Sequence, residues 1–422
     1  MNQARLRFCA LLALAALLAG CAPVVPHLTP TPAVFKDPRL DFERHLQPGL
    51  RSTQLPVFFA TTREATDGPE HFGNAQAEGV TLGLATVRLG EPGWSWEQLL
   101  ASDRSSSVSQ PRPGAVELVQ TMGKAGTGDT LAEADRQFIA QIDAQIARTS
   151  NRSVMMYVHG YRVTFDEVAV QMGSFAHYLA QEATVTFQWP TGTMFWNYVT
   201  DCPNARRSIP DIARMVRLLA RTQAAQINLL AYSCGSPLLA SALAQLRAEN
   251  AALDPAGLQQ RFRLGNIIFA ASDVDLKTFA REHVKPALDM GRQVIVYFSR
   301  ADRALGFSSL ISGASRLGHP DLKDLEGLSP AELRVITEDP RFQAIDVTDV
   351  RGAHEMGGMK GHGYWYANEV ISTDVALSLR YPIPPEQRCL RNERGTRVWR
   401  MPDDYVDCVA NRLLQAYPAL RR

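Results

Sequence analysis

Short apolar runs alternate with longer amphipathic segments through most of the chain after residue 153. This alternation is typical of βαβ units, in which helices join parallel strands. The predicted strands are Val154–Val158, Val185–Trp189, Ile227–Tyr232, Ile267–Ala271, Val294–Ser299 and Ala344–Val347. The pattern therefore predicts an α/β fold with a mostly parallel central sheet and helices on both faces.

Two further β-rich runs, Val57–Thr62 and Val80–Val87, come before this region and are separated by glycine-containing turns. They are expected to be the first strands of the sheet. Residues 102–130 are rich in Ser, Gly, Pro and Gln, which predicts a surface loop. The spacing of apolar residues predicts helices over Ala132–Arg148, Ile212–Leu219 and Tyr366–Leu379.

The first 20 residues have the pattern of an export signal. Arg5 and Arg7 precede an apolar run, Phe8–Leu18, which is too short to span a bilayer permanently, and small residues lead to Cys21. This junction resembles a bacterial lipobox, so residues 1–20 are expected to be removed and Cys21 to carry lipid. An ordinary secretory signal is the alternative. No aspartate retention signal follows the cysteine. The expected location is therefore the bacterial cell envelope, lipid-anchored to the outer membrane and facing the periplasm.

The rest of the chain divides by composition into three parts. Residues 21–54 contain many prolines and little periodicity, which predicts a membrane tether. Residues 55–380 hold the strands and helices of the predicted domain. Residues 381–422 are expected to be a C-terminal extension.

Charge and cysteine content narrow the function further. The formal net charge of +1 gives no indication of a nucleic-acid partner. Cys389 and Cys408 flank a short polar segment and are predicted to form a disulfide in an oxidising compartment, the alternative being two free thiols. Cys202 and Cys234 have no obvious partner. No Cys/His spacing suggests a metal site, and no cofactor is expected.

An apolar strand, a sharp turn and a helical pattern follow one another around Ser233. This serine lies between two small residues, Ala231 and Gly235, at the positions two before and two after it. A nucleophile elbow needs this arrangement, because bulky side chains there would collide with the strand or the helix. Ser233 is the candidate nucleophile, although a plain strand-to-helix turn would give the same pattern.

Other strand ends carry residues that such a nucleophile needs. After Val154–Val158 come His159, Gly160 and Tyr161, where the glycine lets the backbone pass close to the serine. The N–H of Tyr161 and that of Cys234 are the predicted oxyanion hole. A simple turn at His159 is the alternative.

The candidate acid is Asp302, in the loop after Val294–Ser299. It would orient a histidine and stabilise its imidazolium. Asp273 and Asp275, one strand earlier, are competing acids, and Asp275 also suits a helix N-cap.

The candidate base is His362, between Gly361 and Gly363 and just before the last predicted helix. A histidine between two glycines is unlike a packed core residue. His354 is the rival. The order Ser233, Asp302, His362 is the chain order of α/β-hydrolases.

These segments together resemble a bacterial α/β-hydrolase family of uncharacterised function, esterase- or lipase-like in its pattern. The resemblance covers roughly residues 55–379 and rests on Val57–Arg63, Tyr157–Tyr161, Phe187–Pro190, Tyr198–Asp201, Ser272–Asp275 and Ser299–Leu305. It implies the α/β-hydrolase fold and a hydrolytic reaction but no substrate. Tyr232 and Cys234 depart from the family's usual histidine and methionine on either side of the serine, which bears on substrate choice.

The segment after Val185–Trp189 leaves its role open. Trp189, Phe195, Trp196 and Tyr198 either line an acyl or aromatic pocket or pack within the loop, and Asp201 is expected to hold that loop by hydrogen bonds.

The sequence as a whole predicts an envelope-anchored serine hydrolase that cleaves a carboxylic ester or related acyl bond. Its expected partners are an acyl substrate and, through the lipid anchor, a membrane. The alternative is a non-catalytic lipoprotein that uses the same fold as an interaction module of the envelope.

Overall fold

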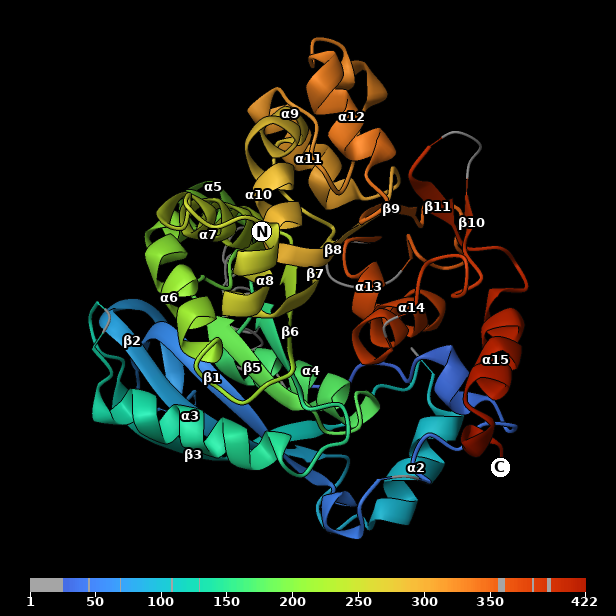
Figure 1. The fold of residues 1–422 in the computed structure, drawn as a ribbon. Coiled ribbons are helices and arrows are strands. Elements are labelled where there is room, and N and C mark those ends of the chain that lie inside the picture. The colour runs from blue at the N-terminus through green and yellow to red at the C-terminus, as the bar shows by residue number, and fades with distance from the viewer. Residues whose placement is uncertain are drawn as a thin grey trace, which may run out of the picture.

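One mixed sheet runs through the molecule in the computed structural model, which describes residues 26–44, 46–68, 70–107, 109–128, 130–355, 361–381, 383–392 and 396–422. Within these ranges the sheet has 11 strands in the order β10-β11-β9-β8-β7-β6-β4-β5-β1-β2-β3 (Figure 1). The strands are β1 (Gln54–Ala65), β2 (Phe72–Leu89), β3 (Gly114–Lys124), β4 (Ser153–Val158), β5 (Ala183–Gln188), β6 (Gln226–Tyr232), β7 (Leu264–Ala270), β8 (Gly291–Phe298), β9 (Phe342–Asp346), β10 (Arg391–Asn392) and β11 (Val398–Arg400).

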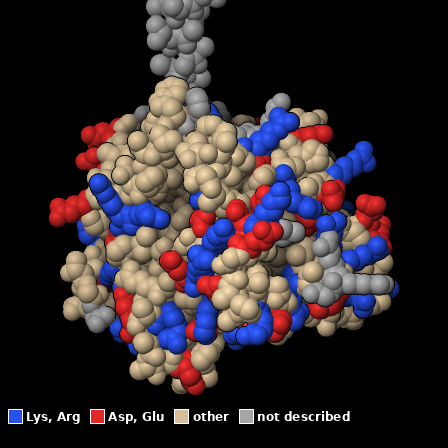
Figure 2. Space-filling view, turned by 90° about the horizontal axis from the view of Figure 1, so that it is seen from above, with Lys and Arg blue, Asp and Glu red and all other residues tan. Residues whose placement is uncertain are grey.

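Helices cover both faces of this sheet. They are α2 (Trp96–Ser105), α3 (Glu133–Ile146), α4 (Phe165–Tyr178), α5 (Tyr198–Asn204), α6 (Ile209–Leu219), α7 (Gly235–Glu249), α8 (Pro255–Phe262), α9 (Leu276–Thr278), α10 (Val284–Met290), α11 (Arg303–Ser312), α12 (Pro330–Glu338), α13 (Tyr364–Ala367), α14 (Glu369–Arg380) and α15 (Tyr405–Ala416). Among the described residues, no helix is both long and apolar enough to cross a membrane. The face seen from above carries positive and negative side chains intermixed (Figure 2).

The centre of the sheet is parallel because helices return the chain across it. Strands β1, β5, β4, β6, β7, β8, β9 and β11 pair in parallel, whereas β2, β3 and β10 pair antiparallel at the two edges. The described strands thus form the mostly parallel sheet that the apolar runs predict.

Two layers of core explain why the central strands are largely apolar. In β4, Val154 and Met156 point into one core, and Met155 and Tyr157 point into the other. Side chains alternate across a strand, so a strand buried on both faces is apolar at most positions. Helices α3, α6, α7, α8 and α10 contribute to the first core, and α4, α14 and α15 to the second.

The edge strand β3 (Gly114–Lys124) lies where the sequence predicts a loop over residues 102–130, so that prediction is wrong. Only Gly114 of this strand is fully buried, and one of its apolar side chains, Leu118, is exposed. Half-exposed edge strands lack the apolar run on which the prediction relies.

The N-terminal segment also differs from its prediction as a tether. Its described residues, 26–44 and 46–54, lie against the domain, and Leu28, Val34, Leu40 and Phe42 are buried in the second core. These apolar residues follow no helical or strand period, which is why the proline content dominates the sequence pattern. Residues 1–25, with the predicted signal and Cys21, lie outside the described residues.

The C-terminal extension completes the opposite edge of the sheet. Strand β11 pairs with β9, and helix α15 adds Tyr405, Val409 and Leu413 to the second core. Cys389 and Cys408, the predicted pair, are joined by a disulfide with 6.1 Å between their Cα atoms.

Candidate active site

The elbow around Ser233 connects β6 to α7. Ser233 has a φ of +51°, in the left-handed region that a side chain disfavours, so the turn is strained. Its N–H donates to the Ala270 carbonyl at 3.1 Å. A Cβ on Gly235 would lie 2.4 Å from the His159 carbonyl oxygen, so only glycine allows α7 to begin this close to β4.

The serine, histidine and acid predicted from the sequence come together at the carboxyl ends of the strands. His362 Nε2 lies 2.8 Å from Ser233 Oγ, and His362 Nδ1 lies 2.7 Å from Asp302 Oδ2. A carboxylate accepts only, so in the neutral imidazole the Nδ1–H donates to Asp302 and Nε2 can accept the Ser233 proton. The geometry is that of a hydrogen-bonded chain from carboxylate through imidazole to hydroxyl.

Asp302 is held by the helix that it begins. It is fully buried, and its Oδ1 accepts the N–H of Leu305 at 3.0 Å as the N-cap of α11. One carboxylate oxygen therefore fixes the helix while the other orients His362.

The rival residues take other positions. Asp275 caps α9 by accepting the Thr278 N–H at 2.7 Å. Asp273 is bonded to Tyr198 and Ser308 rather than to His362. His354 lines another cavity, which Asp302 also borders, and among the described residues no contact joins it to Ser233.

The pKa of His362 is raised above its usual value. Burial of the imidazole acts to lower this pKa, but the charge and hydrogen bond of the Asp302 carboxylate outweigh it, and Asp273 adds a smaller contribution. The site therefore stabilises the imidazolium form of His362.

The predicted oxyanion-hole residues lie on either side of the serine. A Cβ on Gly160 would lie 2.9 Å from the Ser233 Cβ, so the loop after β4 does pass close to the nucleophile. Tyr161 follows this glycine, and Cys234 follows the serine as the N-cap residue of α7. Among the residues that the structure describes, neither N–H has a hydrogen-bond acceptor.

His159 holds the loop that carries Tyr161, a role that the sequence does not reveal. Its Nδ1 is 2.6 Å from the Gly160 carbonyl oxygen, and its Nε2 accepts the Trp189 N–H at 3.1 Å. Burial and the nearby Arg63 charge lower the pKa of His159 well below its usual value. The ring is therefore neutral and stacks on Trp189, with 5.0 Å between ring centroids.

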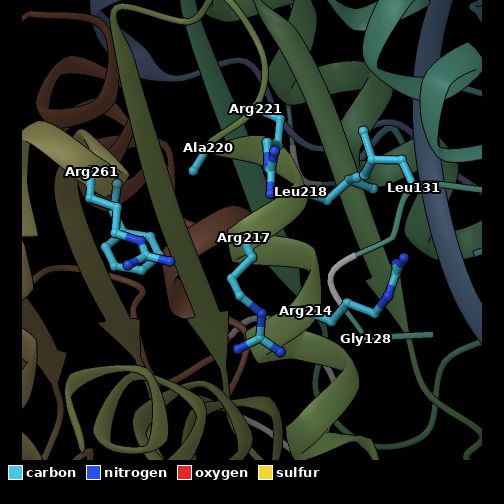
Figure 3. A pocket seen from close by; sticks show the side chains of 9 residues that line it. Gly128, Leu131, Arg214, Arg217, Leu218, Ala220, Arg221 and Arg261 are labelled. Carbon is cyan, nitrogen blue, oxygen red and sulfur yellow. The ribbon is translucent and has the colours of Figure 1, made fainter. Parts of the chain in front are cut away.

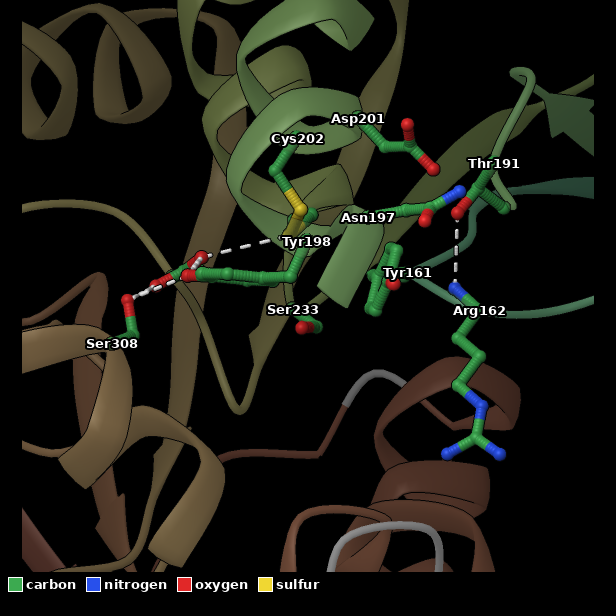
Figure 4. The surroundings of a disulfide bond; sticks show 12 residues. Tyr161, Arg162, Thr191, Asn197, Tyr198, Asp201, Cys202, Ser233 and Ser308 are labelled. Atoms are coloured by element: carbon green, nitrogen blue, oxygen red, sulfur yellow. Dashed lines mark hydrogen bonds between the residues drawn. A yellow bond between two sulfur atoms is a disulfide. The ribbon is translucent and has the colours of Figure 1, made fainter. Parts of the chain in front are cut away.

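A disulfide joins the elbow to α5, which corrects the prediction that Cys202 and Cys234 lack partners. Their Cα atoms are 5.7 Å apart (Figure 4). The two cysteines are 32 residues apart with a helix and a strand between them. No local pattern therefore predicts the contact. Asp273 lies close enough to complete a metal site with the two sulfurs, but these are bonded to each other here.

The segment that carries Cys202 is anchored over the site on several sides. Asp201 Oδ2 accepts the Gly192 N–H at 2.6 Å, the role expected for this acid. The Tyr198 hydroxyl donates to Asp273 Oδ2 at 2.5 Å and lies 2.6 Å from Ser308 Oγ on α11. Burial and the Asp273 carboxylate raise the pKa of Tyr198, so its hydroxyl stays protonated and can donate.

A cavity of about 460 Å³ opens beside Ser233 and His362. Its walls are mainly aromatic, with one exposed arginine and one carboxylate: Tyr161, Tyr198, Tyr232, Tyr366, Phe307, Arg162 and Glu167. Volume and lining are those of a small-molecule site. Of the aromatic residues proposed for a pocket, Tyr198 lines the cavity, whereas Trp189 is fully buried and Trp196 is exposed. The side chain of Phe195 lies outside the described residues.

A second hollow lies beside α6, away from these residues, and is bordered by Arg214, Arg217, Arg221 and Arg261 (Figure 3). Two of these arginines are already neutralised within the protein. Arg214 pairs with Asp135 at 3.0 Å and Arg217 with Glu249 at 2.7 Å. The hollow has no nucleophile, and the cavity at Ser233 is therefore the candidate active site.

A family model described as "Alpha/beta hydrolase of unknown function (DUF900)" matches residues 134–377, more than half of the 422-residue chain. The chain belongs to this family. The family membership and fold predicted from the sequence are thereby confirmed.

Comparisons with curated proteins and solved structures add little information about this chain. No curated protein matches it. A solved structure described as "the putative cell surface hydrolase from Lactobacillus plantarum WCFS1" is similar over 56% of this chain and 96% of that one, at 11% identity and a TM-score of 0.28. A likeness this weak carries no argument about the site.

Proposed function

We propose that this DUF900 hydrolase is a serine hydrolase that cleaves carboxylic esters or related acyl bonds through an acyl-enzyme. The observation that carries the proposal is the chain of hydrogen bonds from Asp302 through His362 to Ser233, at 2.7 and 2.8 Å. It ends on a serine whose strained backbone presents the hydroxyl to a cavity. A structural histidine would not need a buried carboxylate and a strained serine at once.

Each residue has one task in the proposed reaction. Ser233 Oγ attacks the carbonyl carbon while its proton passes to His362 Nε2, and the N–H groups of Tyr161 and Cys234 stabilise the oxyanion. The acyl bond then breaks as the imidazolium returns that proton to the leaving group. Water attacks the acyl-enzyme by the same route, which restores Ser233 and releases the acid.

A fluorophosphonate probe tests the proposal directly, because it reacts with activated serines. The wild-type chain should be labelled, and Ser233→Ala should not be, since it removes the hydroxyl that is hydrogen-bonded to His362. Ser105→Ala, which removes an exposed serine of α2, should be labelled like the wild type. Unlabelled, folded wild type would favour the non-catalytic envelope protein instead.

We further propose that the protein acts in the envelope, anchored by lipid on Cys21. The lipobox-like sequence motivates this location, and the two disulfides fit an oxidising compartment. Mass spectrometry of protein purified from the envelope should find Cys21 at the N-terminus with a diacylglyceryl group. An unmodified N-terminus at another residue would contradict the anchor.

A further inference from the structure

Exposed apolar side chains gather at the opening of the cavity. Among the described residues, large hydrophobic side chains are exposed at Leu118, Met194, Trp196, Val199, Phe307, Leu310 and Ile311. All except Leu118 belong to two short segments, 194–199 and 307–311, on either side of the cavity. We call these six residues the apolar rim. Scattered exposed apolar residues need no explanation, but a gathered set marks an interaction site.

Helix α11 presents its apolar stripe outward. Phe307, Leu310 and Ile311 are spaced i, i+3 and i+4, which places them on one face. That face is exposed, with Leu310 80% accessible, while the polar Ser308 is buried. A helix packed only for stability would bury its apolar face and expose its polar face. The exposed apolar face of α11 therefore indicates contact with an apolar environment.

The two segments are fixed to each other and to the cavity. The Tyr198 hydroxyl of α5 lies 2.6 Å from Ser308 Oγ of α11, and the Tyr161 hydroxyl bonds to the Met194 carbonyl. Tyr198 and Phe307 also line the cavity. The apolar rim therefore borders the walls around Ser233, since Phe307 belongs to both.

Each half of the rim has an exposed arginine beside it. Arg162 Nε donates to the Thr193 carbonyl at 2.8 Å, next to Met194. Arg303 begins α11 four residues before Phe307, on the same face of the helix. Within the described part of the chain, neither guanidinium forms an ion pair with a carboxylate. Apolar side chains flanked by arginine suit a surface of acyl chains beneath phosphate groups.

We propose that the apolar rim seats the protein on a phosphate-bearing lipid surface and that the substrate is an acyl ester drawn from that surface. This deepens the proposed function and rests on it for the reaction. The rim residues enter the acyl region, Arg162 and Arg303 contact headgroup phosphates, and the ester carbonyl reaches Ser233 through the cavity. A protein partner would account only for the apolar rim. A lipid surface accounts for all three features, because its acyl chains contact the rim, its phosphates contact the arginines and its ester enters the cavity.

Hydrolysis of dispersed and soluble esters tests this in the full chain. Leu310→Ser/Ile311→Ser removes two rim residues that do not line the cavity, and Leu118→Ser removes an exposed leucine elsewhere as the matched control. On a water-soluble short-chain nitrophenyl ester, kcat/KM of both variants should stay within about twofold of wild type. On a long-chain nitrophenyl ester in vesicles of phosphatidylcholine and phosphatidylglycerol, the rim variant should lose about tenfold and the control nothing.

A second measurement asks whether the rim itself enters the lipid, whatever else anchors the chain. Trp196 is 58% exposed, so brominated phosphatidylcholine should quench part of the tryptophan fluorescence of the wild type. The quenching that comes from Trp196 should be absent in Trp196→Phe. Equal quenching in both proteins, or a vesicle rate that is unchanged in the rim variant, would overturn the proposal.

The two proposals can fail separately. If the soluble ester is cleaved but the rim variant behaves like the Leu118→Ser control, the lipid surface is wrong and the serine hydrolase stands. If no ester is cleaved while Trp196 is still quenched, the proposed reaction fails, and the rim is a lipid-binding surface of a non-catalytic protein.

Discussion

At the scale of single residues, the site depends on which histidine is hydrogen-bonded to both an acid and a serine, and not on how many histidines lie nearby. His362 has Asp302 on one ring nitrogen and Ser233 on the other. His159 directly follows strand β4, but its two ring nitrogens hydrogen-bond to the backbone of Gly160 and Trp189. One histidine is thus arranged to move a proton and the other to hold a loop.

Replacing His362 and His354 separately should distinguish the base from its rival. His362→Ala should lower kcat/KM for a soluble ester by about three orders of magnitude or more, because Ser233 loses its proton acceptor. His354→Ala is the matched control and should change it by less than about threefold. The measurement is steady-state hydrolysis with both proteins shown to be folded by circular dichroism. If His354→Ala were the inactive variant, His354 would be the base and not His362.

At the scale of elements, the sequence predicts a strand or a site residue where a pattern of neighbouring residues reveals it. Strands β4, β6 and β7 are mostly apolar and are found by pattern alone. Ser233 and Asp302 are found because each lies at or just after the end of a strand, and His362 because it stands between two glycines just before a predicted helix. Strand β3 is missed because an edge strand buries few side chains.

Contacts between distant segments leave no local signal at all. The Cys202–Cys234 disulfide depends on α5 folding back over the elbow, which only the tertiary structure determines. In the same way, the buried ion pair of Arg388 with Asp374, at 2.8 Å, joins the C-terminal extension to α14. Arginine in a polar C-terminal stretch is more often exposed, so its burial could not be predicted from composition.

The elbow disulfide should matter for activity as well as stability, and the C-terminal disulfide for stability alone. Cys202→Ser opens a closed loop of 32 residues and Cys389→Ser one of 19. In the chain-entropy model the first should therefore lose about 4 kcal/mol of unfolding free energy and the second about 3 kcal/mol. Only Cys202→Ser frees α5 from the Cys234 backbone, whose N–H is proposed to hold the oxyanion. Its kcat should fall about tenfold.

Denaturant unfolding and steady-state kinetics below the unfolding midpoint check this pair of variants. The double variant Cys202→Ser/Cys234→Ser excludes an effect of the free Cys234 thiol, and it should behave like Cys202→Ser. Equal losses of kcat in Cys202→Ser and Cys389→Ser would mean that the elbow disulfide serves only stability.

At the scale of the whole molecule, segments far apart in sequence close around the end of the sheet. Arg380, the last residue of α14, donates to the Tyr178 carbonyl at the end of α4 and to the Phe42 carbonyl of the N-terminal segment. Glu182 is buried just before β5, and its Oε1 accepts Asn151 Nδ2 at 2.6 Å. The N-terminal segment is therefore joined to α4 and α14, two helices of the second layer, near one buried carboxyl.

Burial raises the pKa of Glu182 to about 7, although the hydrogen bond from Asn151 acts to lower it. The folded protein thus holds a proton that the unfolded chain releases above its ordinary pKa near 4.5. By linkage, the stabilisation is fully present below about pH 4.5 and decreases as pH rises to about 7. The decrease amounts to about 3 kcal/mol of unfolding free energy.

Glu182→Gln should remove this pH dependence, because a neutral amide imitates the protonated acid at every pH. Relative to the wild type, the variant should gain about 3 kcal/mol of unfolding free energy between pH 4.5 and pH 7.5. Urea unfolding at several pH values, with both disulfides intact, measures the difference. Glu64→Gln, which removes an exposed carboxyl of β1, is the matched control and should run parallel to the wild type. If Glu182→Gln also ran parallel, the carboxyl would be ionised in the folded protein, and Arg380 would have to compensate its charge.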